Sequence, residues 1–359
     1  MHVGYRILIL GASYGSLFAT KLLLAAHTVK LVCPAAAADL INEEGTRVNL
    51  PVKGWNGGLL EIDSRTLPGK LSADVPGAVD PDAYDLVVLA MQDPQYSSPD
   101  LRKLLAAVAA ARVPCLSIMN MPPLPYLARI SGIKIEPCRA SYTDASVWDE
   151  LDPSLITHCS ADPQASHVVD RPTNVIQVRL PTNFRAARFA SETHTEMLRR
   201  LAADIEMARF DTTAGRIELP VKLRVHDSIF VPLSKWPMLI AGNYRCITRD
   251  GMRTIDATVY TDLAASQSVY EWVLGLCRLL GAERNDFVPF ERYAAAAAAL
   301  TVPSSAARAL FGGAAHIERV DRLVQSLAAQ KGTRLEALDD VVALVDAHLE
   351  TNRNAGGLT

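Results

Sequence analysis

Residues 5–33 constrain the fold most strongly. The apolar run YRILIL (5–10) is typical of a buried strand, and GSLFATKLLLAA (15–26) has apolar residues at helical spacing. The β-branched run VKLVC (29–33) then indicates a second strand. YDLVVLAM, DLRKLLAAVAAA and VPCLSIM repeat this order between residues 84 and 119. Such alternation predicts a parallel sheet covered by helices.

The first strand and helix are joined by GASYGS, residues 11–16. A phosphate-binding turn uses glycine for its tight bend and for close approach of a pyrophosphate to the N–H groups of the helix N-terminus. In the usual G-x-G-x-x-G register, the three positions are Gly11, Ser13 and Ser16. Matching on the helix instead makes Gly15 the last glycine and shortens the loop by one residue. A plain strand-to-helix connection is the simpler alternative.

We predict that this turn binds a dinucleotide through six residues: Gly11, Ala12, Ser13, Tyr14, Gly15 and Ser16. The second strand ends at Cys33-Pro34, followed by AAAA, so this position has neither the carboxylate that favours NAD nor the arginine that favours NADP. Arg47 or Lys53 would have to reach the pocket to hold a 2′-phosphate. The turn alone leaves the choice between NAD and NADP open.

The rest of the chain predicts two domains and a tail. Residues 43–82 are rich in Gly, Pro and Asp and suit extra strands and loops, and 136–190 is irregular around the strand NVIQVRL (174–180). From Ser191 onward helical patterns dominate. We therefore expect a Rossmann-type α/β domain with a mostly parallel sheet at 1–210, an all-helical domain at 211–350 and a tail at 351–359.

The composition and the local motifs indicate which classes of binding partner to expect. The chain has 359 residues and a net charge of −3, so it lacks the basic footprint of a nucleic-acid-binding protein. No apolar run approaches the roughly 20 residues that span a bilayer. Six scattered cysteines without a C-x-x-C pair, and a start without a signal-peptide pattern, suit a cytoplasmic protein. Motifs of metal sites and serine hydrolases are missing from the sequence. We expect a small-molecule partner, with no metal, nucleic acid or membrane.

The sequence resembles the ketopantoate reductase family. The matching stretches run in order along the chain: GSLFATKLLLAAHTVKLV, INEEG, YDLVVLAMQ, CLSIMN, KLRVHDSIFVPLS, AGN, VPSSAAR and HIERVD. The resemblance implies an NADPH-dependent 2-oxoacid reductase with a Rossmann domain and a helical domain like that of 6-phosphogluconate dehydrogenase. It also suggests a homodimer formed through the helical domain.

The resemblance assigns roles to individual residues. Lys222 matches a lysine, on a helix of the second domain, that donates a proton to the substrate carbonyl as hydride arrives. Asn120 matches an asparagine that bridges cofactor and substrate, and Asn243 lies in the matching AGN stretch. Ser305 and Glu318 fall near a serine that binds the substrate carboxylate and a glutamate that supports the site. The FGGAAH loop is one residue longer, so these last two matches can slip by one position.

Three departures fall in the expected pocket. Gln92 replaces a family lysine near the cofactor, and His226 replaces an asparagine one turn after Lys222. Another substrate-binding asparagine becomes Phe230 or Val231. On a helix, His226 would share the face of Lys222 and serve as a proton donor or substrate ligand. Ketopantoate itself is therefore a less expected substrate than a related carbonyl.

Two alternatives remain open. An opine-type dehydrogenase reduces an imine made from a 2-oxoacid and an amine, and the neighbouring His226 and Asp227 are acid groups of the kind that such chemistry uses. A non-catalytic NAD(P)-binding sensor would explain the altered glycine turn and Gln92. For either enzyme the expected cofactor is NADP, with NAD second.

Overall fold

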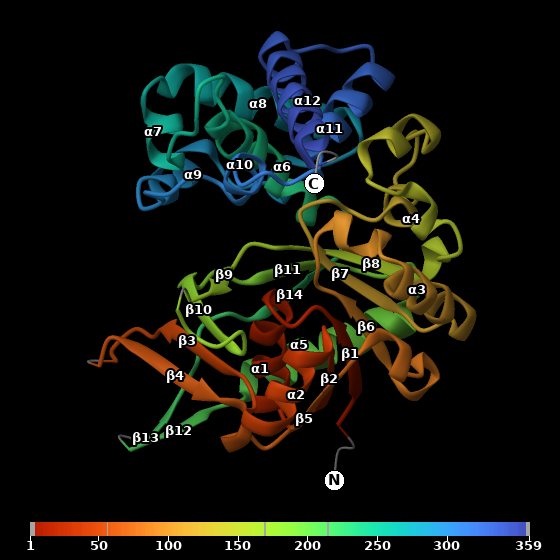
Figure 1. Cartoon of the computed structure of the whole chain (residues 1–359), viewed down its shortest axis with the longest axis vertical. Helices are drawn as coiled ribbons and strands as arrows, with labels where there is room; N and C mark the ends of the chain where they lie inside the picture. The colour runs from red at the N-terminus through yellow and green to blue at the C-terminus, as the bar shows by residue number, and fades with distance from the viewer. Residues whose placement is uncertain (1–3, 56, 169, 214, 357–359) are drawn as a thin grey trace. The chain divides into compact units, whose positions relative to one another are not determined.

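The computed structural model describes residues 4–55, 57–168, 170–213 and 215–356 (Figure 1). The chain forms two compact units. The first contains Met1–Met91, Gln95–Tyr126 and Val147–Ile229, and the second contains Gln92–Pro94, Leu127–Ser146 and Phe230–Thr359.

The first unit is built on an eight-stranded sheet in the order β14-β11-β8-β7-β6-β1-β2-β5. Its six strands from β8 to β5 are parallel, β11 runs antiparallel to β8, and β14 is parallel to β11. The prediction of a mostly parallel sheet is therefore confirmed. The strands are β1 (Arg6–Leu10), β2 (Thr28–Val32), β5 (Lys70–Asp74), β6 (Leu86–Leu89), β7 (Cys115–Met119), β8 (Ile156–Ser160), β11 (Phe184–Ala187) and β14 (Leu223–His226).

A second sheet packs against the first helix, α1 (Tyr14–Leu24). This sheet has the order β4-β3-β10-β9, with β3 (Arg47–Pro51), β4 (Leu59–Asp63), β9 (Gln164–His167) and β10 (Val175–Leu180). Helix α1 (Figure 1) contacts strands of both sheets and α5 (Glu192–Met207). Every residue from Gly15 to Leu24 is buried. A helix that is apolar on nearly all sides is expected to lie inside a core in this way.

The remaining elements of the first unit are short or peripheral. They are α2 (Ala35–Glu44), α3 (Pro99–Ala111) and the hairpin of β12 (Phe210–Thr212) and β13 (Gly215–Ile217). Helix α4 (Leu124–Leu127) straddles the point where the chain leaves this unit.

The second unit is helical. In its described part the backbone has no strand beyond one isolated bridge between Ile247 and Met252. Its helices are α6 (Lys235–Met238), α7 (Ile255–Tyr260), α8 (Leu263–Leu279), α9 (Phe290–Ala297), α10 (Ser305–Phe311), α11 (Val320–Gln330) and α12 (Glu336–Gly356). None of the described helices has the length and apolar character needed to cross a membrane.

The boundary between the units differs from the expected one at residue 210. Strands β12 to β14 follow that residue yet belong to the first unit, so the helical unit resumes at Phe230. Helix α12 covers most of the expected tail, and residues 357–359 lie outside the described part. Strand pairing is a long-range interaction, which local periodicity does not reveal.

Candidate functional site

The glycine turn leads from the carboxyl end of β1 into α1. The first turn of α1 contains no acidic residue, and its N-cap residue Ser13 makes no side-chain capping hydrogen bond. The Ser16 hydroxyl donates instead to the carbonyl of Ala12. Helix N-termini present N–H groups without intrahelical partners and carry partial positive charge. This end of α1 is therefore suited to an anion such as a pyrophosphate.

Gly11 and Gly15 are required for different physical reasons. Gly11 has φ +109°, and a Cβ there would lie 2.6 Å from the Ala90 carbonyl oxygen. A Cβ on Gly15 would lie 2.7 Å from Cγ2 of Ile9. Gly11 thus makes the bend and Gly15 lets the helix approach the sheet closely. These are the roles of the first and last glycines of the fingerprint, so the shortened-loop alternative describes the turn.

Neighbouring parallel strands bring one more predicted residue, Asn120, to the same edge of the sheet. Strand β6 lies next to β1 and β7 lies next to β6, and Ala90 and half-buried Asn120 follow their carboxyl ends. The amide of Met91 donates to the Tyr96 hydroxyl at 3.2 Å, which holds the loop after β6. Ligands of open α/β sheets bind at this edge. Gln92 belongs to the second unit.

The structure places a carboxylate, that of Asp74, beside the end of β2, and the sequence analysis missed it. Val32 pairs with Asp74 at the carboxyl end of the neighbouring strand β5, and the Cys33 amide donates to the Asp74 carbonyl at 3.0 Å. The Asp74 carboxylate lies 3.1 Å from Nζ of Lys30. Burial, followed by the charge of Asp74, raises the pKa of the Cys33 thiol to about 11. Only strand pairing reveals that Asp74 is adjacent.

Arg47 and Lys53 do not follow β2 directly. Helix α2 carries the chain roughly 15 Å along its axis before Arg47 begins β3 of the second sheet. There the Arg47 guanidinium lies 3.7 Å from the Glu44 carboxylate, and Lys53 lies in the exposed turn after β3.

Lys222 immediately precedes β14 in the first unit, and so does not lie on a helix of the second. The residue is 4% exposed. Its Nζ lies 3.0 Å from the Glu218 carboxylate and 3.5 Å from the carbonyl oxygen of Glu206. The expectation of a helical lysine was wrong because LRVH (223–226) pairs in parallel with β11. In this arrangement the ammonium is neutralised by a carboxylate.

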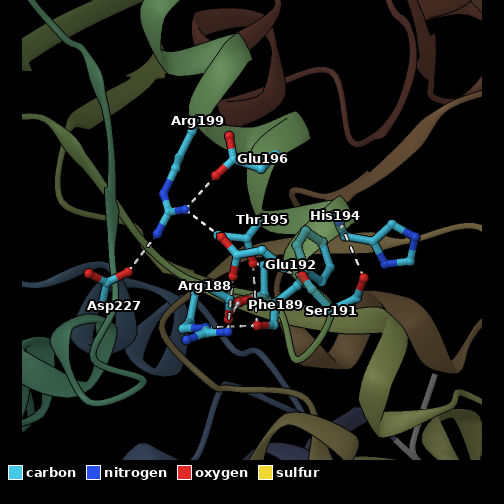
Figure 2. Close-up of polar contacts among 10 residues, drawn as sticks. Arg188, Phe189, Ser191, Glu192, His194, Thr195, Glu196, Arg199 and Asp227 are labelled. Carbon is cyan, nitrogen blue, oxygen red and sulfur yellow. Dashed lines mark hydrogen bonds and ion pairs between the residues drawn. The ribbon is translucent and has the colours of Figure 1, made fainter.

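His226 ends the same strand. It lies four positions after Lys222, which in a strand corresponds to roughly 13 Å, so the two side chains are not neighbours as they would be on a helix. Asp227 lies 2.7 Å from the Arg199 guanidinium, which also contacts Glu192 and Glu196 (Figure 2). This exposed network occupies the carboxylate that the opine-type alternative requires as an acid.

The second unit gathers three of the predicted substrate-site segments. Asn243 ends the π-helical turn η9 (Leu239–Asn243), and its carbonyl accepts from the Ser304 hydroxyl at 2.7 Å. Ser304 is the N-cap of α10, and exposed Ser305 is the first residue of that helix. The Tyr244 hydroxyl donates to the carbonyl of buried Glu318. Short π-helical turns frequently mark functional sites.

Lys21, on the buried helix α1, was also missed. It is 2% exposed, and its Nζ donates to the carbonyls of Leu219 and Pro220 at 3.2 and 2.9 Å. Burial, followed by the charge of Lys222, lowers the pKa of Lys21 from 10.5 to about 7. Val221, which follows Pro220 in the chain, has φ +66°, a costly conformation for a β-branched side chain.

The lowered pKa of Lys21 predicts a pH-dependent stability. Between about pH 7 and 10.5 the unfolded chain holds the lysine proton that the folded unit has released. The free energy of unfolding therefore rises with pH in this window. We expect wild type to gain up to roughly 1.4 kcal/mol per pH unit relative to Lys21→Met between pH 7 and 10. Urea unfolding at several pH values measures this gain, with exposed Lys103→Met as the control. Parallel pH profiles for wild type and Lys21→Met would contradict the prediction.

Comparisons with known proteins identify the fold. No protein-family model matches the sequence, and no curated protein sequence matches it significantly. Solved structures do match, over 97% of this chain in each of three cases. A 2-dehydropantoate 2-reductase from Methylococcus capsulatus is 14% identical, with 97% of its chain covered and a TM-score of 0.63. A ketopantoate reductase from Ralstonia eutropha JMP134 is 16% identical, with 99% covered and a TM-score of 0.60. A D-mandelate dehydrogenase in a ternary structure with NADH and anilino(oxo)acetate is 14% identical, with 99% covered and a TM-score of 0.63.

These likenesses define the chain as a two-domain protein with the ketopantoate reductase fold. The resemblance predicted from the sequence is thus confirmed at the level of the fold. Because fold alone does not fix chemistry, the reaction has to be argued from the site.

Proposed function

We propose that this protein is an NAD(P)H-dependent reductase of a 2-oxoacid or a related carbonyl compound. The observation that carries the proposal is the glycine turn, where Gly11 and Gly15 bring an uncapped helix N-terminus to the carboxyl edge of a parallel sheet. A dinucleotide pyrophosphate matches this site in charge and in hydrogen bonding. The D-mandelate dehydrogenase of the same fold holds NADH and anilino(oxo)acetate, which supports a nicotinamide cofactor with an oxo substrate.

Carbonyl reduction needs a hydride, a proton and stabilisation of the alkoxide as it forms. The cofactor supplies the hydride when bound. Asn120 at the edge of the sheet is proposed to contact the cofactor and the substrate. In the helical unit, Asn243 and Ser305 are proposed substrate-binding residues and Glu318 is a proposed catalytic residue. Lys222 remains the proposed general acid, and in that role it has to leave its ion pair with Glu218.

A substrate panel tests the function. Purified protein should oxidise NADPH or NADH in the presence of at least one member of a 2-oxoacid panel. A parallel set of reactions with added amino acids tests the opine-type alternative, which predicts that turnover depends on the amine. Tight cofactor binding without turnover on a broad carbonyl panel would instead support a sensor, and absence of cofactor binding would overturn the proposal.

We predict that NADPH binds roughly tenfold more tightly than NADH, a difference of about 1.4 kcal/mol. The resemblance favours NADPH, and strand β2 itself ends without a carboxylate. Asp74 opposes this preference, but Lys30 at 3.1 Å balances its charge. Asp74→Asn should therefore widen the preference for NADPH by a few-fold, and Lys30→Met should narrow it. Titration of each reduced cofactor against tryptophan fluorescence at fixed ionic strength measures both effects.

The exposed residue Asp100, at the start of α3, provides a matched control because Asp100→Asn removes the same charge elsewhere in the first unit. A preference for NADH that neither Asp74→Asn nor Lys30→Met alters would contradict the cofactor prediction while leaving a dinucleotide-dependent function intact.

A further inference from the structure

The second unit contains a cavity of about 530 Å³ that none of the predicted site residues lines. Three segments form it: the 3₁₀ turn η5 (Glu136–Ser141), helix α8 through Trp272, and the stretch from α11 into α12. All of these belong to the helical unit. The volume lies within the range of sites that bind small molecules.

Hydrogen bonds hold the wall between η5 and α11. The Ser326 hydroxyl donates to the Pro137 carbonyl at 3.0 Å. The Gln330 amide both accepts from the Lys134 backbone N–H at 2.8 Å and donates to its carbonyl at 3.1 Å. This reciprocal pair fixes the segment 127–146 against α11, so the wall is formed before any ligand arrives.

Asp339 holds the part of the wall that α11 and α12 form. Its two carboxylate oxygens accept from Gln325 at 2.6 Å and from Arg334 at 2.5 Å. The charge of Asp339 is therefore balanced by Arg334. Arg322, which also lines the cavity, then remains as its second cationic side chain.

Arg322 and Arg319 share one carboxylate partner, Asp346. Nη2 of Arg322 lies 3.3 Å from Asp346, and Asp346 also pairs with Arg319 at 2.5 Å. Arg319 also pairs with the buried Asp321 at 2.9 Å, so two carboxylates face two guanidinium groups, and the Arg322 side chain is 42% exposed. A guanidinium has five N–H donors in a fork that matches carboxylate and phosphate. The lining residues Arg322, Arg334 and Asp339 together carry a net charge of +1.

Ser141 also belongs to the lining and is 2% exposed, with its hydroxyl oxygen fully buried. Half-buried Trp272 and the aliphatic side chains of Leu335 and Leu338 supply an apolar surface in the same cavity.

We propose that this cavity binds a small organic anion. The carboxylate or phosphate group of the ligand pairs with Arg322, and its apolar or aromatic body lies against Trp272. This site is separate from the proposed reductase function and does not depend on it.

Titration of the full chain with three probes tests the proposal. Benzoate and phenyl phosphate carry the two anionic groups on the same ring, and benzyl alcohol is the neutral comparison. Calorimetry should show binding of at least one anion, with benzyl alcohol at least tenfold weaker. Comparison of the two anions identifies which group the site prefers.

Variants locate the binding. Arg322→Met should weaken binding of the anion at least tenfold, and Arg308→Met, which removes an exposed arginine of α10 outside the cavity, should have no effect. Arg322→Lys, which keeps the charge, should retain part of the affinity and shows that the fold survives. Equal binding of benzyl alcohol, an unchanged affinity in Arg322→Met, or displacement of the anion by NADPH would each overturn the proposal.

Discussion

Replacement of Gly11 by alanine is expected to destabilise the first unit by about 2 to 3 kcal/mol and to weaken dinucleotide binding at least tenfold. The backbone of Gly11 has φ +109°, and the added Cβ would lie 2.6 Å from both the Ala90 carbonyl oxygen and Cγ of Met91. Either the turn or strand β6 has to move, and both carry parts of the proposed cofactor site. Urea unfolding and fluorescence titration with NADPH measure the two effects.

The variant Gly54→Ala distinguishes the effect of backbone strain from the effect of a steric clash. Gly54 has φ +85°, but a Cβ there would meet no atom within 4 Å. Gly54→Ala should therefore destabilise the protein by less than Gly11→Ala and leave cofactor affinity unchanged. Gly15→Ala tests the contact with Ile9 at 2.7 Å without a positive φ. If Gly11→Ala bound NADPH like wild type, the turn would not be the pyrophosphate site.

Lys222→Met is expected to lower kcat by two to four orders of magnitude while cofactor binding survives, if Lys222 supplies the proton. A single-turnover assay with the active 2-oxoacid measures the chemical step. Because the ammonium pairs with Glu218, Lys222→Met also leaves that carboxylate without its ion-pair partner. The variant Glu218→Gln measures how much the loss of this ion pair alone lowers kcat. Glu218→Gln should retain most of the activity.

Lys235 is the matched comparison for this experiment. It begins α6 in the helical unit, on a helix as the family resemblance expects of the catalytic lysine. A large loss of activity in Lys235→Met, together with normal turnover in Lys222→Met, would move the role of acid from the strand to the helix. Circular dichroism of each variant shows whether the fold is intact.

The sequence predicted those elements whose signal is local. The apolar runs of β1 and β7 and the helical spacing in α1 appear within one or two residues of their expected bounds. Strand β14 was not predicted, since LRVH is short and becomes a strand only by pairing with β11. The family resemblance placed Lys222 on a helix because matched sequence order does not report which neighbour a segment pairs with.

In the candidate site, too, only the features with a local sequence signal were predicted. The glycine turn was found because its bend and its small residues follow one another in the chain. Asp74 and Lys21 were not, because Asp74 approaches Cys33 across a strand pair and Lys21 reaches Leu219 from a helix distant in sequence. Such partners are long-range contacts, and a single sequence gives no signal for them.

The burial of α1 between two sheets and α5 has a consequence for hydrogen exchange. A helix without an exposed face has no partial opening that frees its amides, so their exchange requires the first unit to unfold as a whole. A ligand held by the first turn of α1 would therefore slow exchange along the entire helix, by the factor 1 + [L]/Kd. Mass spectrometry of the peptide covering residues 14–24 would then measure occupancy of the dinucleotide site without any enzymatic turnover.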